Sequence, residues 1–157
     1  MILVDTFVAG RPKTKGSMRV RNRQTLAMEE GVGGSSTWRA LMASAVRDDY
    51  QRRIPPWCVG ERRDPTAGPV LVVATFCLPV DPLRVNAGDL DKLTRNLLDA
   101  IASDARNPRY RGGVILNDNQ VAELRVRKTG PPFTLTSGCG VLVRIETLDT
   151  SAMHGVL

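Results

Sequence analysis

Apolar positions in the first third of the chain change their period, and each period predicts a different element. Val4 to Val8 is a short apolar segment that ends at Gly10 and predicts a first strand. Ser35-Ser36-Thr37 then offers a helix N-cap, and apolar residues recur at helical spacing as far as Tyr50, before Pro55-Pro56 stops the helix. The buried face of this predicted helix is formed by Trp38, Leu41, Met42, Ala45, Val46 and Tyr50.

A continuous apolar, β-branched run follows, and it predicts a buried central strand from Pro69 to Val80. A second helix is predicted from about Leu90 to Ser103. Its apolar face comprises Leu90, Leu93, Leu97 and Ile101, and its polar side carries Lys92, Arg95, Asn96 and Asp99.

Two stretches of alternating residues close the chain. Leu124 and Val126 mark one strand, and Val141, Val143 and Ile145 mark the last. We expect these two strands to pair as a hairpin across the turn at Gly130-Pro131-Pro132. The order β-α-β-α-β-β predicts an α+β fold with helices packed on one mixed β-sheet.

The length of 157 residues predicts a single domain, residues 1–157, with a core that needs no disulfides. Within it, residues 11–34 are predicted to form a basic flexible loop, and residues 149–157 a tail. No apolar run is long enough to span a membrane, and the N-terminus has no signal-peptide pattern. Three widely spaced cysteines suit a reducing compartment, so we expect a cytoplasmic protein.

The net charge of +6 is informative about function because the excess of basic residues comes from one short segment. Between residues 11 and 23 there are basic side chains and no acids, while elsewhere 16 basic residues balance 16 acidic ones. Such a segment indicates contact with a polyanion, most simply nucleic acid; a solubilising loop is the alternative. The basic residues are Arg11, Lys13, Lys15, Arg19, Arg21 and Arg23.

Acidic residues are the candidate catalytic groups, because the sequence has a single histidine, His154, close to its end. Asp89 and Asp91 begin the second predicted helix, where acids also serve as ordinary helix caps or first-turn charges. Asp91, Arg95 and Asp99 also follow one another at intervals of four residues, a spacing that allows a row of ion pairs on the surface of the helix.

Asp118, in "VILNDNQVAEL", interrupts a strand-like stretch, and strand pairing is expected to bring it near Asp89 and Asp91. Three converging carboxylates repel unless a divalent cation lies between them, and an all-oxygen site favours Mg²⁺ or Mn²⁺. Beside a basic segment such a site suits phosphodiester hydrolysis, with Arg95 or Lys92 contacting the phosphate.

These segments together resemble the RusA family of Holliday-junction resolvases. "DLDKLTRNLLDAI", from Asp89 to Ile101, is similar to the family's D-x-D-N-L-x-K pattern and the D-A-L that follows it. "NDNQV", from Asn117 to Val121, resembles its D-D-x-Q-V segment, and "GRPKTKGSMRVR" resembles its basic G-x-P opening. The departures are Lys92 for an Asn, Arg95 for a Lys and Asn117 for an Asp.

The resemblance implies a Mg²⁺-dependent endodeoxyribonuclease, with Mn²⁺ as a substitute, that resolves Holliday junctions and other branched DNA by paired nicking as a homodimer. It implies that Asp89, Asp91 and Asp118 bind the metal and that Arg95 is the catalytic cation. If the protein is phage-encoded, the compartment is the host cytoplasm. A non-catalytic phage nucleic-acid-binding protein of the same fold is the alternative, and a structural domain with acidic helix caps is a third possibility. The residues expected to contact DNA are Arg11, Lys13, Lys15, Arg19, Arg21, Arg23 and Lys92.

Overall fold

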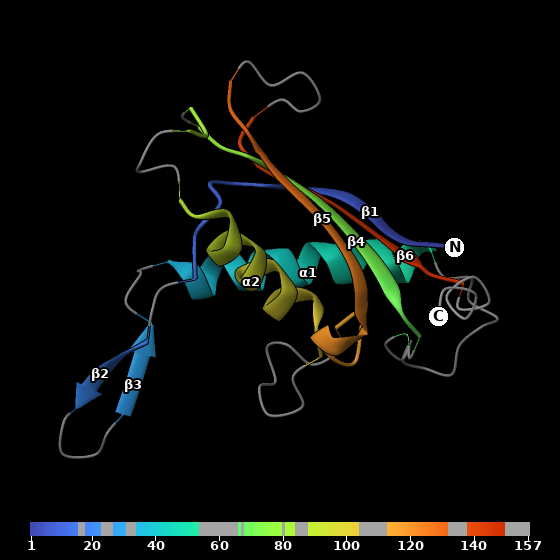
Figure 1. Ribbon diagram of the computed structural model, residues 1–157, viewed down its shortest axis with the longest axis horizontal. Coiled ribbons are helices and arrows are strands. Elements are labelled where there is room, and N and C mark those ends of the chain that lie inside the picture. Colours follow the sequence, from blue (N-terminus) through green and yellow to red (C-terminus); the bar gives the residue numbers. More distant parts are fainter. Residues whose placement is uncertain are drawn as a thin grey trace, which may run out of the picture.

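A computed structural model describes residues 1–15, 18–22, 27–30, 34–53, 66, 68–79, 81–83, 88–103, 113–131 and 138–149, with backbone alone for 18–22 and 27–30. Its elements, in order, are β1 (Ile2–Ala9), β2 (Met18–Asn22), β3 (Ala27–Glu30), α1 (Ser35–Arg53), β4 (Val70–Cys77), α2 (Leu90–Ile101), the 3₁₀ turn η3 (Asp118–Gln120), β5 (Val121–Thr129) and β6 (Gly140–Thr147). Figure 1 shows their arrangement.

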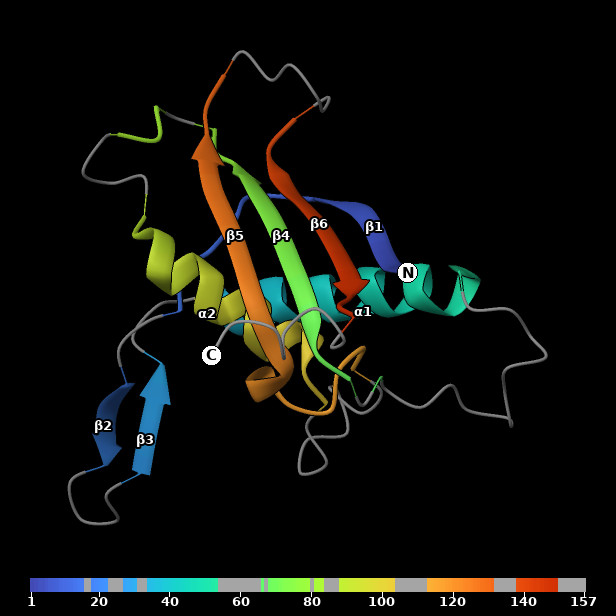
Figure 2. The ribbon, with the colours of Figure 1, turned by 45° about the vertical axis from the view of Figure 1, so that its right-hand side comes forward.

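Four strands form the main sheet, in the order β1-β6-β4-β5 (Figure 2). β6 is antiparallel to both of its neighbours, β1 and β4, whereas β5 runs parallel to β4. The predicted α+β class, the β-α-β-α-β-β frame and the central position of the apolar strand are therefore confirmed. The expected hairpin between the last two strands is wrong, because β4 lies between β5 and β6.

The pattern of burial explains why β4 occupies the centre. Every residue of β4 is buried or half-buried, so its side chains need cover on both faces and neighbours on both edges. β5 carries charged residues on one face and has no fully buried residue, which suits an edge strand.

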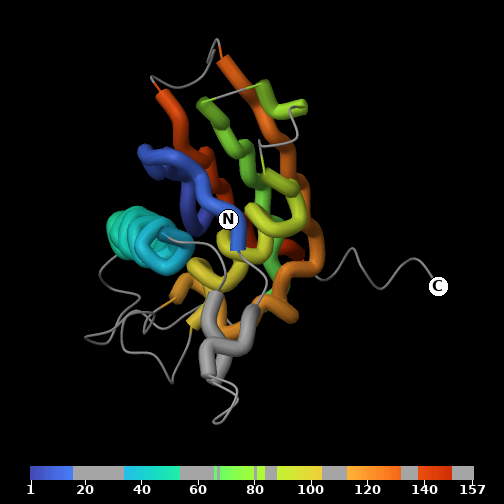
Figure 3. The backbone as a smooth tube through the Cα atoms, turned by 90° about the vertical axis from the view of Figure 1, so that its left-hand side faces the viewer, coloured from blue at the N-terminus to red at the C-terminus, as the bar shows by residue number. Residues whose placement is uncertain are grey.

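Both helices pack on one face of the sheet (Figure 3). The face of β4 that meets them consists of Val70, Val72, Ala74 and Phe76, all buried. On α1 the predicted positions Trp38, Met42, Val46 and Tyr50 are buried, but Leu41 is 47% exposed. In the described residues neither helix is long and apolar enough to cross a membrane.

α1 also covers the free edge of β1 with charged side chains. The Asp49 carboxylate accepts the backbone N–H of Asp5 at 2.7 Å, and the Arg53 guanidinium donates to the carbonyl oxygen of Asp5 at 2.9 Å. Arg53 also lies 2.6 Å from Asp49. These side chains satisfy backbone groups that a further strand would otherwise pair with.

Residues 11–34 differ from the predicted loop. β2 and β3 pair antiparallel as a separate two-stranded sheet, in which Arg19 lies opposite Glu29. This hairpin projects away from the main sheet (Figure 1). The predicted tail lies outside the described residues except for Asp149.

Candidate metal and nucleic-acid site

Gly88 fixes the entry of the chain into α2. Its φ of 87° lies in the left-handed region, and a Cβ at this position would come within 2.8 Å of the Thr14 Cγ2 atom. The Lys128 ammonium, from the end of β5, donates to the Gly88 carbonyl oxygen at 3.0 Å. A side chain at position 88 would therefore strain the backbone and force the Thr14 side chain to shift.

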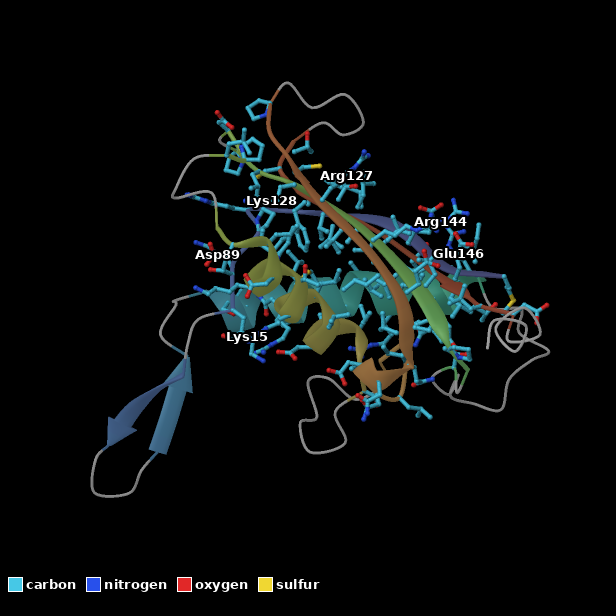
Figure 4. The ribbon with its side chains drawn as sticks, in the orientation of Figure 1. Lys15, Asp89, Arg127, Lys128, Arg144 and Glu146 are labelled. Atoms are coloured by element: carbon cyan, nitrogen blue, oxygen red, sulfur yellow. The ribbon has the colours of Figure 1, made fainter. Side chains whose placement is uncertain are left out.

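Asp89 occupies the N-cap position of α2 but does not cap the helix. Its backbone is extended, and its carboxylate makes no capping hydrogen bond. The side chain is 64% exposed and lies 2.9 Å from the Lys92 ammonium (Figure 4 labels Asp89). The view of Asp89 as a helix cap thus fits its position but not its hydrogen bonding.

Two neighbouring cations lower the pKa of the Asp89 carboxylate. The hydrogen bond and charge of Lys92, with a further contribution from the charge of Lys128, lower the pKa of Asp89 below its usual range. The same contact raises the pKa of Lys92 above that of a free lysine. At neutral pH Asp89 is therefore an anion and Lys92 a cation, so Lys92 does not act as a general base.

Asp91 and Arg95 are exposed one turn apart on the same helix. The predicted row Asp91–Arg95–Asp99 does not form, because Asp99 instead lies 2.5 Å from Lys15 and 3.0 Å from Arg39. Asp99 therefore joins α2 to α1 and to the N-terminal segment. No ion pair of Asp91 or Arg95 occurs among the described residues, which leaves both side chains available to ligands.

The N-terminal basic segment runs along α2. The Lys15 amide donates to the Lys92 carbonyl oxygen at 3.1 Å, and the Asn96 side chain donates to the Lys13 carbonyl oxygen at 2.9 Å. Asn96 is fully buried, so the polar side of α2 does not face solvent along its whole length. Figure 4 labels Lys15, Asp89 and Lys128 around this end of the molecule.

The expected DNA-contacting residues fall into four groups. Arg11 is exposed and Lys13 is half-buried beside α2, whereas Lys15 and Lys92 already have acidic partners. Arg19 and Arg21 belong to β2, of which the backbone alone is described. Arg23 lies outside the described residues. Lys128 was missed by the sequence analysis, because the assumed hairpin gave no reason to place the end of β5 beside α2.

Asp118 lies in η3, and its neighbours hold this turn in place. The Gln120 side-chain oxygen accepts the amide N–H groups of Leu116 and Asn117 at 2.7 and 3.0 Å, while its amide group donates to the carbonyl oxygens of Thr66 and Gly68. The Asn117 side chain caps the turn. Asp118 itself is exposed.

The structure does not bring Asp118 to Asp89 and Asp91. Val114 and Ile115 pair with the last turn of α2, near Ile101, and β5 begins opposite Val70. Asp118 therefore lies at the C-terminal end of α2, whereas Asp89 and Asp91 lie at its N-terminal end. A helix of 12 residues is about 18 Å long. Among the described residues no three His, Cys, Asp or Glu side chains are grouped to hold a metal ion.

The expected convergence of the three aspartates within one chain is therefore wrong, and the parallel pairing of β4 with β5 is the reason. Asp89 follows the end of β4, and Asp118 precedes the start of β5. In a parallel pair the start of one strand lies beside the start of the other, so these two positions fall at opposite ends. An antiparallel pair would have brought them together.

Within one chain, the fit to a magnesium ion is limited to two carboxylates. Asp89 and Asp91 present oxygen ligands at one end of α2, and Mg²⁺ is commonly held by one or two carboxylates together with water and substrate phosphate. Lys92, Arg95 and Lys128 belong to the same region and supply positive charge. The donor set thus fits a site that a phosphate group helps to complete.

Comparison of the sequence with models of protein families and with curated proteins found no match in either case. The function is therefore inferred from the residues and from the geometry described above.

Proposed function

We propose that this protein is a Mg²⁺-dependent endodeoxyribonuclease that nicks branched DNA, such as four-way junctions, as a homodimer. The observation that carries the proposal is the exposed carboxylate pair, Asp89 and Asp91, at the start of α2 beside Lys92, Arg95 and Lys128. Negative ligands for a cation and positive ligands for a phosphate are thus placed in one exposed region. The resemblance of this helix to the RusA family supports the same reaction.

The residues of the site have different roles in the proposed reaction. Asp89 and Asp91 would hold the ion, and the lowered pKa keeps Asp89 ionised well into the acidic range. A bound Mg²⁺ supplies Lewis-acid polarisation of the phosphate and a bound water of lowered pKa. Arg95 would contribute the positive charge of its guanidinium to the phosphate.

The DNA backbone is proposed to pass along the N-terminal segment. Arg11 is exposed there, and Lys13 is fixed beside α2 through its own carbonyl oxygen. Both side chains would meet phosphates next to the one being cleaved. Such contacts position the duplex but read no sequence.

A nicking assay tests this function. Wild-type protein is expected to nick a labelled synthetic four-way junction in Mg²⁺ and to be inactive in a chelator. Asp91→Asn is expected to lower the cleavage rate by roughly 100-fold, the scale on which the loss of one transition-state charge contact is felt. Asp48→Asn, an exposed acid on α1, is the matched control and should cleave like wild type. Equal rates for Asp91→Asn and wild type would reject the site.

One observation favours a second candidate, a non-catalytic nucleic-acid-binding protein. Asp118 is separated from the carboxylate pair in one chain, and Lys92 already neutralises Asp89. This candidate predicts salt-sensitive binding to branched DNA without cleavage in Mg²⁺ or Mn²⁺. The same assay distinguishes the two candidates.

A further inference from the structure

The N-terminal end of α1 has amide groups that nothing in the fold caps. The first hydrogen bond of the helix joins the Trp38 amide to the Gly34 carbonyl oxygen at 3.0 Å, so the N-cap residue is a glycine and has no side chain to cap with. In the described part of the chain no acceptor is bonded to the amides of Ser35, Ser36 or Thr37. The first turn also contains no acidic residue that would offset the positive end of the helix dipole.

Ser35 adds a hydroxyl group without a partner. The residue is 0% exposed, and its Oγ atom forms no hydrogen bond. A buried polar group of this kind is unfavourable until an acceptor or donor bonds to it. Because the side chains of a helix lean towards its N-terminus, this hydroxyl lies at the same end as the free amide groups. Ser36 and Thr37 beside it are exposed, so this end of the helix is open to solvent.

Lys13 brings a cation to the same end of α1. Its side chain passes beside Gly34, since a Cβ atom built on that glycine would lie 3.8 Å from the Lys13 Cε atom. Among the described residues the Lys13 ammonium has no acidic partner. Lys15 and Arg39, in contrast, both bond to Asp99. The charge of Lys13 is therefore not used within the fold.

We propose that the N-terminus of α1, together with Ser35 and Lys13, binds a phosphate group of the DNA backbone. Free amide groups and the helix dipole favour an anion at this place. The Ser35 hydroxyl donates a further hydrogen bond, and the Lys13 ammonium contributes positive charge. The unesterified oxygens of a backbone phosphate can accept from these donors together, and helix N-termini are regular phosphate contacts in DNA-binding proteins.

The phosphate site lies near the carboxylate pair of α2. The Lys13 carbonyl oxygen accepts a hydrogen bond from Asn96 at 2.9 Å, and Asn96 lies about 7.5 Å beyond Asp91 along the helix axis. Phosphates of one DNA strand recur about every 3.4 Å of the duplex axis. The bound phosphate is therefore a near neighbour of the one to be cleaved. Its assignment to DNA rests on the proposed function, whereas the anion site itself does not.

Amide chemical shifts test the anion site with inorganic phosphate as the probe. In nuclear magnetic resonance spectra of the wild-type protein, the Ser36 and Thr37 amide signals are expected to shift and to saturate as phosphate replaces chloride at constant ionic strength. Ser36→Pro removes one amide N–H in the first turn, where proline is tolerated, and Ser36→Ala keeps it. Read at Thr37, Ser36→Pro should bind phosphate roughly tenfold more weakly than Ser36→Ala, because a hydrogen bond to a charged group is lost.

Two further variants leave the backbone of the helix unchanged, so they test the site even where Ser36→Pro fails to fold. Lys13→Gln removes the charge and Ser35→Ala removes the buried hydroxyl, and each should weaken phosphate binding severalfold. The control is Ser44→Ala, which alters an exposed serine in the middle of α1 and should bind phosphate like wild type. Circular dichroism checks that each variant is folded.

Fluorescence anisotropy with a labelled four-way junction, in a metal chelator, identifies the source of the phosphate. Ser36→Pro is expected to bind the junction roughly tenfold more weakly than Ser36→Ala. Lys13→Gln should also reduce the slope of log K against log salt by about 0.9, the value for one phosphate contact.

The outcomes separate this inference from the proposed function. Amide signals that do not saturate with phosphate, or phosphate affinities that all four variants share with wild type, overturn the site. Phosphate binding with unchanged junction affinity in Ser36→Pro and Lys13→Gln overturns the assignment to DNA and leaves free phosphate as the ligand. Junction binding that depends on the site, without any cleavage, supports the inference and rejects the nuclease. Cleavage by wild type with none of these effects overturns the inference and leaves the nuclease standing.

Discussion

Lys92 lies 2.9 Å from Asp89, in the place where a cation would approach that carboxylate. The pair lowers the pKa of Asp89 and raises that of Lys92, so both groups stay charged across the neutral range. In the proposed metal site the ammonium would compete with a divalent ion for the same oxygen. Residue 92 would thus set how readily the carboxylate pair takes up a metal.

The variant Lys92→Asn tests this competition. We expect it to strengthen Mn²⁺ binding severalfold, because the ion no longer displaces an ammonium from Asp89 and no longer meets its charge. Titration calorimetry measures the change. Arg144→Gln, which removes a distant cation of β6, is the control for net charge and should leave the affinity almost unaltered. Weaker binding by Lys92→Asn would mean that Lys92 supports the site instead.

Two helices perform different tasks at the level of whole elements. α2 separates the candidate ligands, since its N-terminal end carries Asp89 and its C-terminal end lies beside the segment that leads to Asp118. α1 instead closes one edge of the sheet through Asp49 and Arg53. Burial alone would raise the pKa of Asp49, but the hydrogen bonds from the Asp5 amide and Arg53, with the charges of Arg53 and Arg52, outweigh it and lower the pKa.

The pH dependence of stability follows from that lowered pKa. Asp49 stabilises the fold above the pKa of an unfolded aspartate, about 3.9, and this contribution is lost as the pH falls from there towards the lower folded value. Asp49→Asn is therefore expected to reduce the free energy of unfolding at pH 7 by about 2 kcal/mol, because charge-assisted hydrogen bonds of a buried group are lost.

Urea unfolding at several pH values measures this effect. The difference between Asp49→Asn and wild type should shrink as the pH falls below about 4, where Asp49 of the unfolded chain takes up a proton while folded Asp49 is still ionised. Asp48→Asn changes the exposed neighbour and should stay within about 0.5 kcal/mol of wild type. A difference that is the same at pH 3 and pH 7 would contradict the ion-pair explanation.

At the scale of the whole molecule, the surplus positive charge is divided between internal contacts and exposed positions. Lys15 is held by Asp99, so part of the basic segment fixes the N-terminus to α2. Arg11 is exposed at the head of the same segment. Affinity for a phosphate backbone is therefore expected to depend on where a basic residue lies, and not on the net charge of +6 alone.

Salt titration of DNA binding tests this division. Arg11→Ala should weaken binding of a labelled junction in a metal chelator and reduce the slope of log K against log salt by about 0.9, the value for one phosphate contact. Lys15→Ala should leave that slope unchanged, since its ammonium is bonded to Asp99. Fluorescence anisotropy between low and moderate salt gives both slopes. An unchanged slope for Arg11→Ala would exclude this residue from the DNA contact.

Much of the fold could be predicted because it is specified locally. Trp38, Met42, Val46 and Tyr50 repeat at helical spacing, and the apolar run of β4 reads as a strand that must be covered on both faces. A helix or strand pattern depends on neighbours within a few residues, so the sequence displays it directly. The positions of Asp89 and Asp91 at the start of α2 were set in the same way.

The pairing of strands, in contrast, was decided by the tertiary structure alone. The sequences of β5 and β6 do not indicate that β4 lies between them. This arrangement makes β4 and β5 parallel, and it places Asp118 at the far end of α2. The same packing buries Asn96 and brings Lys128 to Gly88. Local sequence determines which elements form, whereas contacts between distant segments depend on how all the apolar surfaces are buried together.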